Sequence, residues 1–182
     1  MRPLIPSVRL ACSASTRSIA TAVKLKAMAT RVFSQQPDLV AALPQLLAHA
    51  RRFFAAELEV LSASPPNRAS PERASVTLRL SCARYPGEGT FVVTARPNQA
   101  ADRAAAEVAE QRGKAGGMAG LAARCVAVWE VTTEGEVSGT AELQLSALLA
   151  SVGLGPVMPL DQSTLYGVRG AMERAEKVAA GG

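Results

Sequence analysis

Two neighbouring segments in the middle of the chain alternate between apolar and polar residues, and this pattern constrains the fold most. In residues 75–83 every second position is apolar: Val76, Leu78, Leu80 and Cys82. Period two places these side chains on one face of a strand and the polar ones on the other. Residues 85–89 contain one proline and two glycines and predict a turn. Residues 90–96 then form the return strand, so the sequence predicts a half-buried β-hairpin.

A second pair of strands is expected further along the chain. Residues 124–132 carry apolar side chains at both alternating sets of positions, which is typical of a central strand covered on both faces. Glu134-Gly135 predicts a tight turn, and residues 137–145 again alternate with period two, which predicts a fourth strand. A helix over residues 140–152 fits the same apolar residues, so strand and helix both stay open over 137–146.

The apolar residues before the first hairpin are spaced as in a helix. Apolar residues recur at intervals of three and four from Leu43 to Leu61, which predicts an N-terminal helix unit over residues 34–62 with Pro44 in its first turn. Prolines and serines then dominate residues 63–74 and predict an extended surface linker. The remainder, residues 75–182, is expected to form one α+β domain.

Two further helices are expected within that domain. Residues 99–112 are mostly alanine, which has a high helix propensity. Asp161 is expected to cap a last helix that ends before Gly181-Gly182. The expected order is helix, hairpin, helix, hairpin, helix. It predicts an α+β fold in which helices pack on one face of an antiparallel sheet of about four strands, made of two hairpins.

The N-terminal segment differs in composition from the rest. Residues 1–33 carry six basic side chains and no acidic one, among several serines and threonines. This composition is typical of a mitochondrial transit peptide. The run Arg31-Val32-Phe33-Ser34 fits a presequence cleavage pattern, so we expect the mature chain to start near Ser34. A plastid address shares much of this composition, and Met28 offers a start for a cytosolic form.

Most of the net positive charge lies in this segment. The whole chain has a formal charge of +5, whereas the residues after 33 hold 14 basic and 15 acidic side chains, a formal charge of −1. Nucleic-acid binding draws its affinity from clustered cations that displace counterions. The charge of the remaining chain therefore does not favour a nucleic-acid partner.

Residues with catalytic or metal-binding chemistry are few and scattered. The one histidine, His49, lies inside the first expected helix without a cysteine or second histidine nearby that would complete a metal site. We interpret it as a partly buried flank residue rather than a base or ligand. Cys82 and Cys125 fall within expected strands and are interpreted as buried, unreactive thiols. The sequence predicts no catalytic residue, no metal and no cofactor.

A glycine-rich segment, residues 113–117, is the best candidate for a ligand site. Its glycines expose backbone N–H groups, and the neighbouring cations could hold an anion facing Arg96 or Arg124. The candidate residues are Arg112, Lys114, Gly116 and Gly117. The spacing of a phosphate-binding P-loop is absent. A helix C-cap followed by a flexible connection explains the same glycines.

Two hypotheses concern residues 143–161. The loop 153–161 holds two glycines and two prolines among apolar residues. It is either a binding surface for a partner or apolar ligand, or a rigid crossover under the last helix. Residues 143–160 lack charge over 18 positions, near the lower limit for a membrane span. Their glycines, prolines and polar residues favour a buried core segment, so we expect peripheral membrane attachment at most.

These observations predict a non-catalytic mitochondrial accessory or assembly protein of a larger complex, in the matrix or at the inner membrane. Its partners would be other protein subunits, bound through the alanine-rich helix 99–112 and the loop 153–161. The alternative is a small anion- or ligand-binding domain, or an enzyme, with its site at the glycine-rich loop 113–117.

Overall fold

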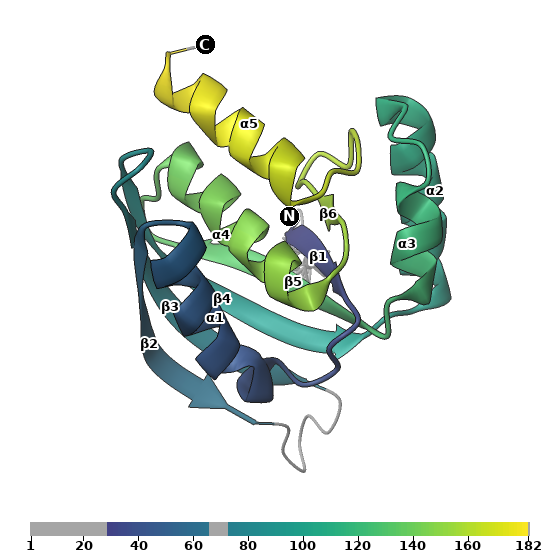
Figure 1. Ribbon diagram of the computed structural model, residues 1–182. Helices are drawn as coiled ribbons and strands as arrows, with labels where there is room; N and C mark the ends of the chain where they lie inside the picture. Colours follow the sequence, from purple (N-terminus) through teal and green to yellow (C-terminus); the bar gives the residue numbers. More distant parts are fainter. Residues whose placement is uncertain (1–28, 66–72, 182) are drawn as a thin grey trace, which may run out of the picture.

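The computed structural model describes residues 29–65 and 73–181 (Figure 1). In this part the chain forms a six-stranded antiparallel sheet in the order β2-β3-β4-β5-β1-β6 and five helices. The predicted α+β class is confirmed, although the sheet has six strands rather than about four. The elements are β1 (Thr30–Ser34), α1 (Leu39–Phe53), β2 (Ala56–Ser64), β3 (Ala74–Cys82), β4 (Gly87–Pro97), α2 (Ala100–Gly113), α3 (Met118–Arg124), β5 (Ala127–Glu134), α4 (Gly139–Gly153), β6 (Val157–Met158) and α5 (Val168–Ala179).

The hairpin predicted from the alternating segments is confirmed. β3 and β4 pair from Ala74 opposite Ala95 to Cys82 opposite Gly87, and the apolar set on β3 is buried. The third predicted strand is also present, although β5 begins at Ala127 rather than at Arg124. It lies between β4 and β1, so the prediction of a central strand is confirmed.

The helix predicted over residues 34–62 is wrong at both ends. Residues up to Ser34 belong to β1, Asp38 caps α1, and the helix ends at Phe53. Ala55 takes a left-handed conformation with φ +48°, and the chain then turns into β2 along the edge of the sheet. Leu58 lies at helical spacing from Phe54, but it also alternates with Glu57 and Glu59, and that second pattern is the one the structure follows.

Two neighbouring predictions also need correction. Pro44 lies within α1 rather than in its first turn. The expected linker 63–74 joins two paired strands, because β2 reaches Ser64 and β3 begins at Ala74. Residues 66–72 of that segment lie outside the described residues. Since α1 and β2 share one core with β3 and β4, residues 34–62 are not a separate unit.

The fourth strand expected over residues 137–145 is wrong, and the alternative helix is confirmed. α4 spans Gly139–Gly153, and the Ser138 hydroxyl caps it by accepting the N–H of Ala141 at 3.2 Å. Eleven of its fifteen residues are buried, because the sheet covers one side and α5 packs on another. A helix buried on several sides is apolar all round, so its sequence shows no clear 3.6-residue period.

The last part of the chain also differs from prediction. Asp161 does not cap the final helix: α5 begins at Val168, and the Asp161 carboxylate accepts the Ser163 N–H in a turn. The expected loop 153–159 contains the two-residue strand β6, and the short helix α3 follows α2 without having been predicted. The alanine-rich helix is confirmed as α2.

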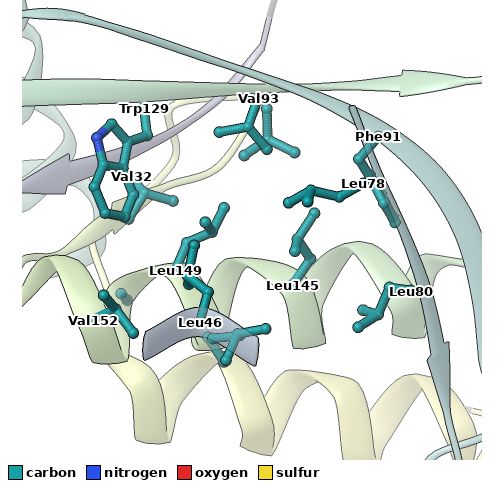
Figure 2. Packing of buried hydrophobic residues seen from close by; sticks show 14 of the residues in the cluster. Val32, Leu46, Leu78, Leu80, Phe91, Val93, Trp129, Leu145, Leu149 and Val152 are labelled. Carbon is teal, nitrogen blue, oxygen red and sulfur yellow. The ribbon is translucent and has the colours of Figure 1, made fainter. Parts of the chain in front are cut away.

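Helices cover both faces of the sheet, not one as predicted. α1 and α4 pack on one face over a core that includes Val32, Trp129 and Leu149, all fully buried (Figure 2). Phe33 and Val128 point to the opposite face, where they form a smaller cluster with alanines of α2 and α3.

Strand β1 falls inside the segment interpreted as a transit peptide. It pairs with β5 on one side and β6 on the other, and Val32 and Phe33 are completely buried. A chain starting at Ser34 would lose this strand and leave β6 without its partner. A presequence compatible with this fold ends before Thr30. Residues 1–28 lie outside the described residues.

A buried ionic cluster connects β1, β4 and β5 to the first turn of α2. The Arg96 guanidinium donates to both carboxylate oxygens of Asp102 and, at 2.8 Å, to Glu130. Arg31 lies 3.6 Å from Asp102, whose carboxylate also accepts the Gln99 N–H at 3.0 Å. Two cations and two carboxylates therefore compensate one another beneath α2, where a single unpaired charge would be costly.

The ionisation of Asp102 links this cluster to pH. Burial acts to raise the pKa of Asp102, but hydrogen bonds from Arg96 and the Gln99 N–H, together with the charges of Arg96 and Arg31, lower it below its ordinary value of 3.8. A carboxyl group whose pKa is lower in the folded chain than in the unfolded chain stabilises the fold at every pH above its pKa in the unfolded chain. This stabilisation is lost as the pH falls through the lowered pKa of the folded chain.

Removal of β1 is expected to prevent folding. Burying Val32 and Phe33 contributes about 1.5–3 kcal/mol each, a large share of the roughly 5–15 kcal/mol that stabilises a typical domain. Residues 29–182 should unfold cooperatively at the same temperature as the full chain, whereas residues 34–182 should show no cooperative transition. Circular dichroism during heating measures both. A cooperative transition in the shorter chain would contradict the role given to β1.

Arg96→Met should lower the free energy of unfolding by about 3–5 kcal/mol at neutral pH, because it leaves the buried Asp102 and the partly buried Glu130 without their main cation. The difference from the parent chain should shrink below about pH 4, as Asp102 becomes protonated. Urea denaturation across pH measures this. Arg79→Met is the matched control: its exposed pair with Glu59 should contribute less than about 1 kcal/mol. Equal effects of the two variants would contradict the assignment.

Candidate functional site

A groove lies on the helical side of the molecule, between α1 and α5. Both helices pack against α4, which lies between them (Figure 1). The groove has a volume of about 340 Å³ and also touches the turn between β3 and β4. We call it the α1–α5 groove; its lining residues are His49, Phe53, Phe54, Arg84, Ser151, Val168 and Met172.

The floor and walls of the groove are mainly apolar. Val168 and Met172 lie one turn apart on α5 and are partly buried against the main core. Phe54 is buried at the end of α1, whereas Phe53 is 56% exposed. An exposed aromatic side chain beside partly buried apolar ones leaves the groove apolar and open to a partner.

His49 is placed by contacts on two sides. Its Nδ1 lies 3.1 Å from the Ser151 hydroxyl, and its ring meets the Phe53 ring edge-on with centroids 5.1 Å apart. The Ser151 hydroxyl donates to the Leu148 carbonyl at 2.7 Å, so its proton points away from the imidazole. His49 then donates to Ser151. This arrangement orients the imidazole in the groove wall and does not activate Ser151 as a nucleophile.

Two arginines lie beside the groove. Arg84, on the β3–β4 turn, lines it, and its guanidinium carbon lies 5.4 Å from the centre of the Tyr85 ring. Arg52, in the last turn of α1, lies with its guanidinium carbon 5.2 Å from the centre of the Phe53 ring. Arg51, in the same turn, lines a different hollow beside Glu57 and Cys82. Among the described residues, no carboxylate lies within salt-bridge distance of Arg52 or Arg84, so their charges are available to an acidic partner.

The glycine-rich candidate site lies elsewhere. Lys114 is the left-handed C-cap of α2, and its N–H bonds to the Glu110 carbonyl. At Gly116 and Gly117, no atom of the described chain beyond the adjacent residues lies within 4 Å of where a Cβ would stand, whereas Gly113 is packed against Thr164. The turn is therefore open at Gly116 and Gly117, which leaves an anion no enclosing wall there. Arg112, Lys114, Gly116 and Gly117 are all exposed.

The cations expected to face this turn are not beside it. Arg96 lies at the opposite end of α2, and a 14-residue helix spans about 20 Å. Arg124 stands at the far end of α3. The interpretation of residues 113–117 as a helix C-cap and connection agrees with the structure, whereas the expected juxtaposition with Arg96 or Arg124 is wrong.

The loop 153–161 is joined to the sheet. Val157 pairs with Val32 of β1 and, on its other side, exchanges two backbone hydrogen bonds with Tyr166. Gly155 passes so close to the Phe33 carbonyl that a Cβ would overlap that oxygen. These contacts agree with the rigid-crossover interpretation for residues 153–158.

The two described cysteines are separated. Cys82 belongs to the main core and Cys125 to the cluster on the opposite face, and both are free. Burial raises the pKa of each thiol to about 11. In residues 29–65 and 73–181, no three histidine, cysteine or acidic side chains lie close enough to bind a metal ion. The same part contains no helix with the length and apolar character needed to cross a membrane.

Comparison with protein-family models, curated proteins and solved structures finds no match to this chain.

The α1–α5 groove was not predicted from the sequence, because its lining comes from segments up to about 120 residues apart. The one local signal is the run Arg51-Arg52-Phe53-Phe54, which places two cations next to two aromatic side chains at the end of a helix.

Both described thiols should resist alkylation in the folded protein. With a pKa of about 11, roughly one thiol in a thousand is ionised at pH 8, and burial excludes the reagent as well. Iodoacetamide followed by peptide mass spectrometry should find Cys82 and Cys125 unmodified in the native chain and fully modified in urea. Rapid native modification of either residue would contradict this account.

Proposed function

We propose that this protein is a non-catalytic accessory or assembly protein of a larger mitochondrial complex, and that it binds another subunit through the α1–α5 groove. The observation that supports this most is the combination of an apolar groove, an exposed Phe53 and two arginines beside it, Arg52 and Arg84. Exposed aromatic side chains beside arginines are typical of the residues that dominate protein–protein binding.

The groove favours an acidic amphipathic helix as the bound segment. Two helices that flank a third leave a trough in which the apolar side of another helix can lie, with anchors at positions i, i+3 or i+4. Arg52 and Arg84 would face acidic residues along the borders of that helix and thereby select it. The orientation of His49 and Ser151 supports binding rather than acyl transfer, because the Ser151 proton is engaged by the Leu148 carbonyl.

The mitochondrial location rests on the composition of the N-terminal segment. Residues 1–28 hold five of the twenty basic side chains and no acidic one. We revise the expected cleavage point, because β1 must be retained: a presequence should end before Thr30. A chain that starts at residue 29 has 15 basic and 15 acidic side chains and is formally neutral.

Substitution of Phe53 is expected to release the protein from its complex. Phe53→Glu places a carboxylate in the lining of the apolar groove, and loss of a dominant anchor weakens binding by at least about 2 kcal/mol, roughly 30-fold. The measurement is native gel electrophoresis of mitochondria from cells expressing the tagged full chain. The parent should migrate with a large assembly, and the variant should migrate near the mass of the lone chain.

Val108→Glu is the matched control. Val108 is 44% exposed on α2, far from the groove, so this variant should stay in the assembly. Arg84→Glu should release the chain at moderate salt, since it reverses one charge beside the groove. Equal migration of parent and Phe53→Glu, or migration of the parent as a lone chain, would contradict the proposal. A cytosolic location of the parent would contradict the assigned compartment.

A further inference from the structure

A second hollow lies on the other side of α4 and α5, and it contains a buried hydroxyl without a partner. It is bounded by α4, α5, the segment 159–166 and Thr30 of β1, and its volume is about 350 Å³. We call it the α4–α5 hollow. Ser146 lines it, is 1% exposed, and its Oγ has no hydrogen-bond partner in the part of the chain the structure describes. A buried hydroxyl that lacks a protein partner and lines a hollow can form a hydrogen bond with a molecule bound there.

A carboxylate stands one helical turn from this hydroxyl. Glu142 and Ser146 are four residues apart on α4 and therefore share one side of the helix. The Thr30 hydroxyl donates to Glu142 Oε1 at 2.7 Å and holds the carboxylate in place. The other oxygen, Oε2, accepts no hydrogen bond from the described residues and can receive one from a bound molecule.

The mouth of the hollow carries one negatively and one positively charged side chain. The Asp161 carboxylate accepts the Ser163 N–H at 3.0 Å, and this hydrogen bond lowers the pKa of Asp161 below its ordinary value. The Arg174 guanidinium lies 4.3 Å from the centre of the Tyr166 ring and donates to the Gly170 carbonyl. The hollow therefore has two carboxylates against one guanidinium, which favours a cation over an anion.

The remaining wall is apolar. Leu143 and Val178 line the hollow from α4 and α5, and Leu160 is 47% exposed at its edge. Tyr166 is buried, and burial raises its pKa to about 12, so its hydroxyl stays protonated. A volume of this size suits a small molecule, and the mixture of a few fixed polar groups with an apolar wall is typical of such sites.

We propose that the α4–α5 hollow binds a small organic ammonium ion with an apolar body of amino-acid size. The ammonium group donates to Glu142 Oε2 and to Ser146 Oγ, and the apolar body lies along Leu143 and Val178. Arg174 stands where it can receive a carboxylate, so a free α-amino acid fits as well as a simple amine. This site is independent of the α1–α5 groove and of the partner proposed for it.

Isothermal titration calorimetry on the full chain tests this with three probes that share one isobutyl group. 3-Methylbutylamine carries only the ammonium, leucine carries both charges, and 4-methylpentanoate carries only the carboxylate. We expect the amine and leucine to bind with dissociation constants on the order of 1 mM, and 4-methylpentanoate not to bind. Equal binding of all three probes, or no binding of the amine, would overturn the proposal.

Variants separate the roles of the lining residues. Glu142→Gln keeps an oxygen that accepts the Thr30 hydrogen bond but loses the charge, and it should weaken binding of the amine by about tenfold. Ser146→Ala should weaken binding of the amine without lowering the melting temperature of the protein, because it removes an unsatisfied hydroxyl. Arg174→Met should weaken binding of leucine but not binding of the amine. Glu173→Gln, on the exposed side of α5 in a pair with Arg169, is the control and should change neither.

Unchanged amine binding in Glu142→Gln would overturn the assignment of the ammonium site, whatever Ser146→Ala does. If Ser146→Ala does not fold, Glu142→Gln alone tests the ammonium site, because that substitution preserves the size of the side chain. None of these outcomes depends on the association of the protein with a larger complex. The two proposals can therefore fail separately.

Discussion

The pairing of β1 between β5 and β6 supports most of the features described above. Each of its first four residues serves a different part of the molecule. Thr30 fixes the Glu142 carboxylate, Arg31 approaches Asp102 in the ionic cluster, Val32 lies in the main core and Phe33 lies in the cluster under α2 and α3. Alternation along a strand sends neighbouring side chains to opposite faces, so one short segment joins both layers of helices to the sheet.

The sequence predicts those elements whose burial differs between their two sides. The β3–β4 hairpin has one buried and one exposed face, and its alternation is visible without a structure. Prediction fails where an element is buried on all sides, or where the same apolar residues fit both the helical and the strand period. α4 is buried on several sides, so its residues fit a strand as well as a helix, and Leu58 fits both the stripe of a helix and the alternation of β2. In both places long-range contacts decide the structure.

Sites are harder to predict than elements for a related reason. The glycine-rich turn 113–117 is conspicuous in the sequence because its residues are consecutive, yet the structure leaves most of it exposed and open at Gly116 and Gly117. The α1–α5 groove and the α4–α5 hollow are each assembled from four or more separate segments. Only the sheet order, with the N-terminal strand next to the last two strands, brings those segments together.

The helix pair α4 and α5 carries both surfaces and keeps them apart. Ser146 and Ser151 are five residues apart on α4, which corresponds to a rotation of about 140° around the helix axis. Val168 and Met172 likewise face the groove, whereas Arg174 and Val178 face the hollow. Because the two surfaces lie on different sides of α4 and share no lining residue, a substitution on one surface removes no contact of the other. The binding properties of the two surfaces are therefore expected to be additive.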